Sequence, residues 1–233
     1  MSDAPTTPVL DAVVPALDAG ARIAATLASL EEARGGPIRE VLVVDGGSGD
    51  DTAARAQAAG ARVISSPRGR GRQLAAGARE SEADWLLFLH ADTRLAPGWL
   101  GQVADFIRTT PNGERAAVFT LAFDDASVHA RGLARLANWR ARRLGLPYGD
   151  QGLVISRALY DRLGGFRPLP LMEDVDLVRR IGRNRLVHLD ALAVTSADGY
   201  RRWGWWPRVA RNLALLALYF LGLPPRLLER LYR

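Results

Sequence analysis

The first 92 residues alternate between short apolar runs and segments with helical spacing, and this alternation limits the possible fold more than any other feature. The apolar runs cover residues 9–17, 40–45, 62–65 and 85–89. Strand–helix–strand alternation with short loops is typical of a parallel sheet with helices on both faces. The runs are continuously apolar, which fits strands buried on both sides. We therefore predict an α/β fold with a mostly parallel sheet flanked by helices.

The pattern loosens beyond residue 92, and the end of the chain has a different composition. Further strands are expected near residues 117–123, 153–156 and 186–194, and further helices over 99–110, 128–144 and 174–181. The tail combines three tryptophans and several arginines with an apolar run over 213–223. Because no repeat or linker is visible, we expect one domain over residues 1–200 and an amphipathic helical tail over 201–233.

Composition excludes several kinds of site. The 233 residues contain no cysteine, and all 31 basic residues are arginine. Disulfides, thiolate zinc sites and cysteine nucleophiles are therefore absent, as are the lysine-dependent P-loop and Schiff-base chemistries. With only three histidines, a histidine-rich metal site is unavailable. A bound metal is expected to be a hard ion with oxygen ligands, hence Mg²⁺ or Mn²⁺.

The net charge of +6 leaves two readings open. One explanation is an anionic partner such as a nucleotide or a phospholipid headgroup. The other is a GC-rich genome that encodes arginine at positions where other genomes encode lysine. The first residues lack the pattern of a signal peptide, and the apolar run over 213–223 is too short to span a bilayer. We expect a cytoplasmic protein without a nucleic-acid partner. Tryptophans beside arginines suit an anchor at the inner face of the membrane, or a tail that packs on the protein's own core.

Acidic residues stand where the predicted strands end. Asp18, Asp45 and Asp92 follow three of the apolar runs, and ligands of parallel α/β sheets bind at the carboxyl ends of strands. After Asp45, a glycine such as Gly47 lets the backbone approach a ligand closely, and the carboxylate suits a base or ribose. The alternative is an ordinary capped turn. Near Asp92, His90 and the carboxylate suit a divalent cation bridging phosphates, or Asp92 caps the next turn.

Two later segments carry further candidates. Glu173 and Asp174 begin a predicted helix, where close carboxylates raise one another's pKa and one becomes a candidate general base. The alternative is that they only cap the helix. Asp150 and Gln151 lie in a glycine-flanked turn, where they suit hydrogen bonds to an acceptor hydroxyl or form an ordinary turn.

The combination of these motifs resembles glycosyltransferase family 2. It comprises Asp-Gly-Gly-Ser-x-Asp-Asp-Thr after a strand, His-Ala-Asp-Thr about 45 residues later, then Gly-Gly-Phe and Glu-Asp-x-Asp-Leu. The resemblance covers about residues 8 to 200 and is nearest to a small bacterial subgroup with His-Ala-Asp-Thr. It implies a GT-A fold and transfer of a sugar from a nucleotide-diphosphate sugar.

The resemblance also implies roles for individual residues. Asp45 would bind the base or ribose, with Asp18 and Arg72 nearby. Asp92 would be the last acid of the family's Asp-x-Asp motif and contact a divalent cation or the diphosphate, and Asp174 would be the catalytic base, supported by Glu173. His90 replaces the first acid of Asp-x-Asp, so it leaves metal dependence open.

These inferences favour an inverting glycosyltransferase acting on a hydroxyl of a small, lipid-linked or otherwise apolar acceptor. Two alternatives remain. A sugar-nucleotide nucleotidyltransferase shares a similar sheet, although its Gly-rich signature with lysine is missing. A non-catalytic nucleotide-binding or membrane-associated protein would account for His90, but it has no need of a base at Asp174.

Overall fold

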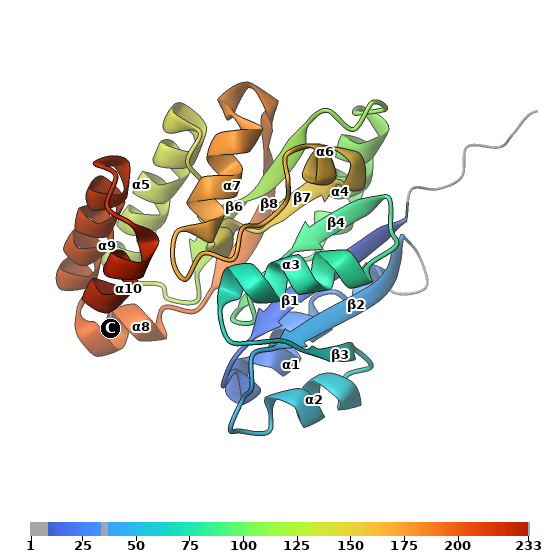
Figure 1. Ribbon diagram of the computed structural model, residues 1–233, viewed down its shortest axis with the longest axis horizontal. Coiled ribbons are helices and arrows are strands. Elements are labelled where there is room, and N and C mark those ends of the chain that lie inside the picture. Colours follow the sequence, from blue (N-terminus) through green and yellow to red (C-terminus); the bar gives the residue numbers. More distant parts are fainter. Residues whose placement is uncertain (1–8, 34–36, 233) are drawn as a thin grey trace, which may run out of the picture.

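A computed structural model describes residues 9–33 and 37–232 and contains one eight-stranded sheet with the strand order β3-β2-β1-β4-β7-β6-β8-β5 (Figure 1). The strands are β1 (Leu10–Ala16), β2 (Ile38–Asp45), β3 (Arg62–Ser65), β4 (Trp85–Phe88), β5 (Thr93–Leu95), β6 (Ala116–Phe123), β7 (Leu153–Ser156) and β8 (Leu186–Thr195). The helices are α1 (Gly20–Ala28), α2 (Thr52–Ala58), α3 (Arg70–Glu80), α4 (Trp99–Arg108), α5 (Val128–Leu144), α6 (Arg157–Arg162), α7 (Glu173–Ile181), α8 (Asp198–Trp203), α9 (Trp205–Phe220) and α10 (Pro225–Tyr232). Short 3₁₀ turns lie at Glu31–Ala33, Gly149–Gln151 and Arg183–Arg185.

The first four strands of the chain form the parallel half of the sheet. β1 pairs in parallel with β2 and β4, and β2 pairs in parallel with β3. Ala16 lies opposite Asp45, which lies opposite Ser65. This register brings the loops after β1 and β2 to one edge, as expected from the acidic strand ends. The predicted α/β fold is confirmed.

The second half of the sheet is mixed. β7 lies between β4 and β6 and runs antiparallel to both, whereas β8 pairs in parallel with β6. The three-residue β5, which the apolar pattern does not reveal, pairs antiparallel with β8. Thr93 and Leu95 of this strand are buried, while Arg94 between them is exposed. Because β7 is antiparallel to β4, the loop that precedes β7 reaches the same edge of the sheet as the ends of β1, β2 and β4.

Helices cover both faces of the sheet. One core contains Ile23 of α1 and Trp99 of α4, and the other contains Leu74 of α3 and Leu177 of α7. α3 lies close against the strands, and Gly77 permits this approach, because a Cβ atom at this position would meet Val13 at 2.4 Å. Two-sided burial agrees with the continuously apolar strands.

The C-terminal extension is helical, as expected, and forms α8, α9 and α10 beside α5 and α7 (Figure 1). The domain boundary predicted at residue 200 falls inside α8. Within the described residues, no helix combines the length and the apolar character that crossing a membrane requires.

Candidate functional site

The loop after β2 is held by its own carboxylates. Asp45 accepts hydrogen bonds from the backbone N–H groups of Gly47 (3.1 Å) and Ser48 (3.1 Å) and from the Ser48 hydroxyl. Gly47 has φ of +86° and open space where a side chain would begin, so the turn needs glycine for its backbone conformation. The carboxylate of Asp45 is thus oriented by the loop.

The loop after β1 is tied to the same segment. Asp18, a non-glycine residue with φ of +48°, accepts from the backbone N–H of Gly49 at 2.8 Å, while its own N–H donates to the Ser48 hydroxyl oxygen at 2.9 Å. Below these loops, the buried amide of Gln73 donates to the carbonyl oxygens of Ala16 and Val44. The predicted donor-binding residues Asp18, Asp45 and Gly47 therefore form one rigid corner.

Arg70, at the start of α3, is a site residue that the sequence prediction did not include. Arg72 is exposed, whereas Arg70 lines a cleft beside the ends of β4 and β8. The guanidinium of Arg70 donates to the carboxylate of Glu173, which is completely buried. Burial raises the pKa of Glu173, and the attraction of Arg70 opposes this. Glu173 thus holds Arg70 in position and does not itself line the cleft.

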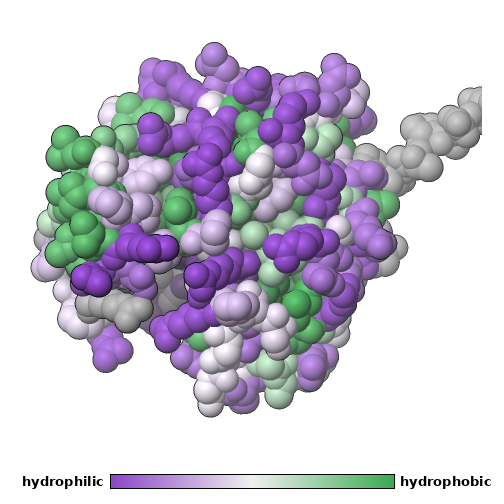
Figure 2. Space-filling model, viewed as in Figure 1, coloured by the Kyte–Doolittle hydropathy of each residue, from purple (hydrophilic) through white to green (hydrophobic). Residues whose placement is uncertain are grey.

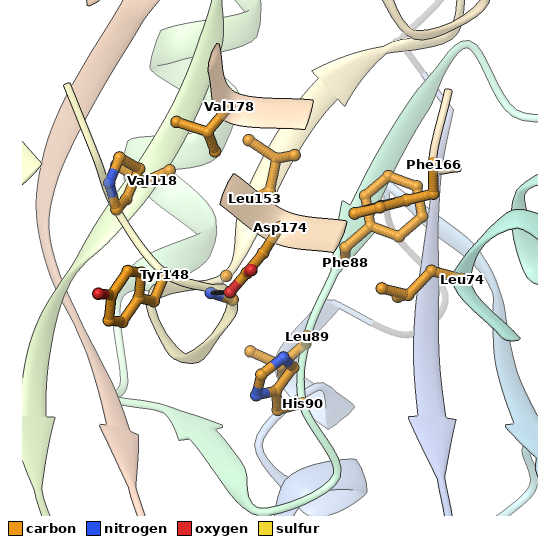
Figure 3. A pocket seen from close by; sticks show the side chains of 13 residues that line it. Leu74, Phe88, Leu89, His90, Val118, Tyr148, Leu153, Phe166, Asp174 and Val178 are labelled. Atoms are coloured by element: carbon orange, nitrogen blue, oxygen red, sulfur yellow. Dashed lines mark hydrogen bonds between the residues drawn. The ribbon is translucent and has the colours of Figure 1, made fainter. Parts of the chain in front are cut away.

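Asp174 lies at the first turn of α7 with its carboxylate fixed by two backbone donors. One oxygen accepts from the N–H of Gly149 and the other from the N–H of Val175, each at 2.8 Å. Figure 3 shows this carboxylate between the loop that carries Tyr148 and the imidazole of His90. Asp174 and His90 line both the open cleft and a smaller apolar pocket behind it. Such a carboxylate is held ready to accept a proton from a group bound in the cleft.

His90 follows β4 and faces the same cleft. Burial and, secondarily, the charge of Arg70 lower its pKa to about 4, against the opposing charges of Asp92 and Asp174. The imidazole is therefore neutral at pH 7 and has a lone pair available. Asp92 is exposed at the rim of the cleft.

His90 and Asp92 fit a divalent cation as a minimal donor set. Within residues 9–33 and 37–232, no group of three or more acidic or histidine side chains converges on one point. One carboxylate and one neutral imidazole match a site in which substrate phosphates and water complete the coordination. The residues are thus compatible with an ion that arrives with a diphosphate.

Asp150 and Gln151 have different environments, although they are adjacent. Asp150 lines the cleft, and one of its carboxylate oxygens is buried without a hydrogen-bond partner among the described residues. Burial raises its pKa to about 6, and nearby Arg140 partly opposes this. Gln151 instead is buried outside the cleft, where its amide donates to the Phe119 carbonyl oxygen at 3.1 Å. The structure thus gives Gln151 a structural contact and leaves Asp150 facing the cleft.

The C-terminal helices complete the cleft, which has a free volume of about 200 Å³. Tyr200 of α8, Arg208 and Asn212 of α9 and Tyr232 of α10 contribute to its wall. Arg208 lies over the Tyr200 ring at 5.0 Å, and its Nε atom is buried without a partner among the described residues. The sequence leaves the position of the tail open, and in the structure the inner side of the tail packs against the rest of the protein.

Comparison with known proteins agrees with this geometry. Residues 11–162 match the sequence model of Glycosyl transferase family 2. The chain belongs to this family. It is therefore a glycosyltransferase that uses a nucleotide-sugar donor, and the nucleotidyltransferase and binding-protein alternatives are disfavoured. The matched segment includes His90, Asp92 and Asp150 and ends before Asp174. The narrower His-Ala-Asp-Thr subgroup stays a prediction.

Solved structures similar to this family 2 chain have the GT-A fold. One is glucosyl-3-phosphoglycerate synthase from Mycobacterium tuberculosis in complex with Mn²⁺, UDP-glucose and phosphoglyceric acid (27% identity, TM-score 0.57, 78% of this chain and 69% of that chain). Another is a further crystal structure of the same synthase (25% identity, TM-score 0.59, 81% and 72% coverage). No curated protein gives a significant sequence match.

The helical register of α3 contains a signal for Arg70 that our sequence analysis missed. Gln73, Leu74 and Gly77 are buried against the sheet, and Arg70 precedes them by three, four and seven residues. This spacing places Arg70 on the inner face of the helix and Arg72 on the outer face. The cleft residues of the C-terminal helices had no comparable local signal, because their contacts depend on how the tail folds back.

Proposed function

We propose that this enzyme transfers a sugar from a nucleotide-diphosphate sugar to a hydroxyl group of an acceptor in the cleft, with inversion at the anomeric carbon. The observation that supports it most is the carboxylate of Asp174, which lines the cleft and is fixed by the N–H groups of Gly149 and Val175. A base held in one orientation acts on one face of the donor sugar.

The proposed reaction balances as follows. The acceptor oxygen forms a bond to the anomeric carbon while its proton passes to Asp174. The bond from that carbon to the diphosphate oxygen breaks, and the nucleoside diphosphate leaves with the electron pair. Arg70, held by buried Glu173, would stabilise the negative charge that develops on the leaving group.

A divalent cation fits the same step. Mn²⁺ accompanies UDP-glucose in the similar synthase structure, and His90 with Asp92 would hold Mn²⁺ or Mg²⁺ here. Such an ion supplies positive charge to the leaving diphosphate. Because the protein would contribute only these two ligands, we expect tight cation binding only when a nucleoside diphosphate is present.

On the donor side, we propose that Asp45 contacts the base or ribose, with Asp18 and Gly47 shaping the corner. On the acceptor side, Asp150 would accept a hydrogen bond from an acceptor hydroxyl, because its free carboxylate oxygen lacks a partner. The rings of Tyr148 and Tyr200 in the cleft wall suit an acceptor with apolar or sugar-ring surface. The small acid in the similar synthase and a lipid-linked alcohol are both compatible with this wall.

A panel of UDP-, GDP- and dTDP-sugars tests the proposal. We expect one donor, with Mn²⁺, to raise the melting temperature and to be slowly hydrolysed or transferred to supplied alcohols. The anomeric configuration of the product is read from its proton NMR coupling constant. Retention of configuration would contradict the role of Asp174 as a base, and the absence of any donor effect would contradict the donor site.

A further inference from the structure

Helix α9 carries functional side chains on one face and exposed apolar side chains on the opposite face. Arg208, Asn212 and Leu215, spaced by four and three residues, line the cleft. Trp206, Leu213 and Phe220 recur every seven residues, and they are 70%, 48% and 47% exposed. At 100° per residue the two sets lie on opposite sides of the helix. A helix that packed only on its own domain would instead turn its apolar side chains inward.

Neighbouring helices extend this exposed apolar surface. His129 of α5 stacks on Trp205 and meets the edge of Trp206, so α5 and α9 lie side by side. Figure 2 shows hydrophobic side chains gathered over this part of the molecule, at the left of the view. We call the set the outer apolar face, and its members are Val128, Leu136, Trp139, Trp206, Leu213, Phe220, Leu221, Leu227 and Leu231. An accumulation of exposed apolar side chains on neighbouring helices is typical of an interaction site.

The charged residues on the helices that carry the outer apolar face are nearly all positive. α5 contains five arginines and no acid, and α9 likewise contains no acid. Exposed Arg135, Arg143, Arg226 and Arg230 have no carboxylate within ion-pair distance among the described residues. By contrast, Arg55 of α2 and Arg108 of α4 are each paired with an aspartate. The arginines near the outer apolar face are thus available to an external anion.

We propose that the outer apolar face docks on an anionic lipid bilayer. Aromatic and aliphatic side chains would enter the interfacial region while the arginines contact lipid phosphates, the arrangement that stabilises interfacial amphipathic helices. A second copy of this chain suits the surface less well, because a two-fold contact would place unpaired arginines against one another.

The position of α9 gives this docking a consequence for the acceptor, which rests on the proposed function. The same helix separates the cleft from the outer apolar face, and a helix with its side chains is only about 10 Å across. An acceptor whose apolar chain stays in the bilayer would therefore reach the cleft around the end of a single helix. Docking itself does not depend on this reading.

Flotation of the full chain with vesicles tests the proposal. We expect binding to vesicles containing 30% phosphatidylglycerol, little binding to pure phosphatidylcholine, and weakening in 0.5 M NaCl. The triple variant Trp206→Gln/Leu213→Gln/Phe220→Gln should bind at least about tenfold less. Arg135→Gln/Arg143→Gln should bind about 30-fold less, at about fivefold per arginine. Leu192→Gln, an exposed leucine on β8, and Arg55→Gln/Arg108→Gln are the matched controls and should bind as wild type.

Three results would overturn the proposal. One is equal binding to neutral and anionic vesicles, and another is unchanged binding of the triple variant. The third is a wild-type dimer in analytical ultracentrifugation that the triple variant converts to monomer, because a second copy would then cover the surface. Donor-induced thermal shifts, measured without lipid on every variant, show whether the nucleotide-sugar site is intact. A failure of docking is thereby distinguished from a failure of the proposed reaction.

Discussion

Two regions of the molecule are rich in acids: the corner formed by the loops after β1 and β2, and the cleft beside β4 and α7. They differ in whether their carboxylates are fully hydrogen-bonded within the protein. In the corner, the carboxylates of Asp18 and Asp45 accept hydrogen bonds from their own loops. In the cleft wall, Asp150 keeps one buried carboxylate oxygen without a partner among the described residues. Buried polar atoms are normally paired. The carboxylates of the corner already have their partners, whereas the free oxygen of Asp150 is available to a ligand. Variants at the two places should therefore fail in different ways.

The largest expected effect is on turnover. Asp174→Asn keeps the shape of the side chain and one of the two acceptor oxygens but removes the base, so the transfer rate should fall by roughly 10²–10⁴. Donor-induced thermal shifts should stay as in wild type. Asp190→Asn, at a side chain that is 94% exposed, is the control, and near-wild-type turnover of Asp174→Asn would refute the assignment.

Next in size is the buried ion pair. Glu173→Ala should lower the free energy of unfolding by roughly 3 kcal/mol, the lower end for a broken buried pair, because the Arg70 side chain is still 40% exposed and keeps contact with water. Urea unfolding measures this. The double variant Glu173→Leu/Arg70→Met should recover part of the loss while remaining inactive. If the double variant were less stable than Glu173→Ala, the ion pair would itself contribute to stability, beyond positioning Arg70.

The pH dependence of stability separates two cleft residues with opposite signs. Asp150, with its pKa raised to about 6 from 3.8, binds more protons in the folded than in the unfolded state between these values. It therefore lowers stability as pH rises from 4 to 6. His90, with its pKa lowered to about 4 from 6.5, binds fewer protons when folded, so it raises stability as pH rises from 4 to 6.5.

These two contributions oppose each other in the wild type, and single variants should expose them. Asp150→Asn should steepen the gain in stability between pH 4 and 6 and stabilise the protein by roughly 2 kcal/mol at pH 7. His90→Gln should remove the gain. Denaturant midpoints at pH 4 to 7 without added cations measure both, and parallel profiles for the two variants would contradict the shifts.

The smallest effect concerns the corner. Gly47→Ala should cost about 1 kcal/mol because φ is +86° although space is free. Gly101→Ala, inside α4 and also with free space, should stabilise the protein by about 0.5–1 kcal/mol. The difference between these two variants in a thermal melt isolates backbone conformation from packing. Equal effects would mean that the turn does not need glycine.

The same contrast explains what could be read from the sequence. The strands other than β5, their acidic ends and the helix beginning at Glu173 were predictable, because apolar runs and glycines are local signals. The placement of Asp150 and Asp174 in one cleft depends on the antiparallel insertion of β7, which no local pattern specifies. Arg70 was overlooked, although its spacing from the buried Gln73, Leu74 and Gly77 places it on the inner face of α3. Gln151 looked available, but its amide is used by the β6 carbonyl of Phe119.

The cleft wall built by α8, α9 and α10 could not be derived from the tail. Trp206 and Arg208 are two residues apart and face opposite environments, one toward solvent and one toward the cleft. Composition indicated either an anchor or a packed helix. The structure has the packed inner face and an outer face that we propose for the bilayer, so the two readings apply to different sides of one helix.

The hydrogen bond between Gly149 and Asp174 couples the position of the loop before β7 to the orientation of the Asp174 carboxylate. A side chain at Gly149 would meet His90 Nε2 at 2.4 Å, so this glycine is held between the imidazole and the carboxylate of Asp174. The loop that would recognise the acceptor and the group that would remove its proton are therefore one mechanical unit. An acceptor too large for the cleft would displace the loop and disorient the base at the same moment. A poorly fitting acceptor would then be rejected by losing its chemistry as well as its contacts.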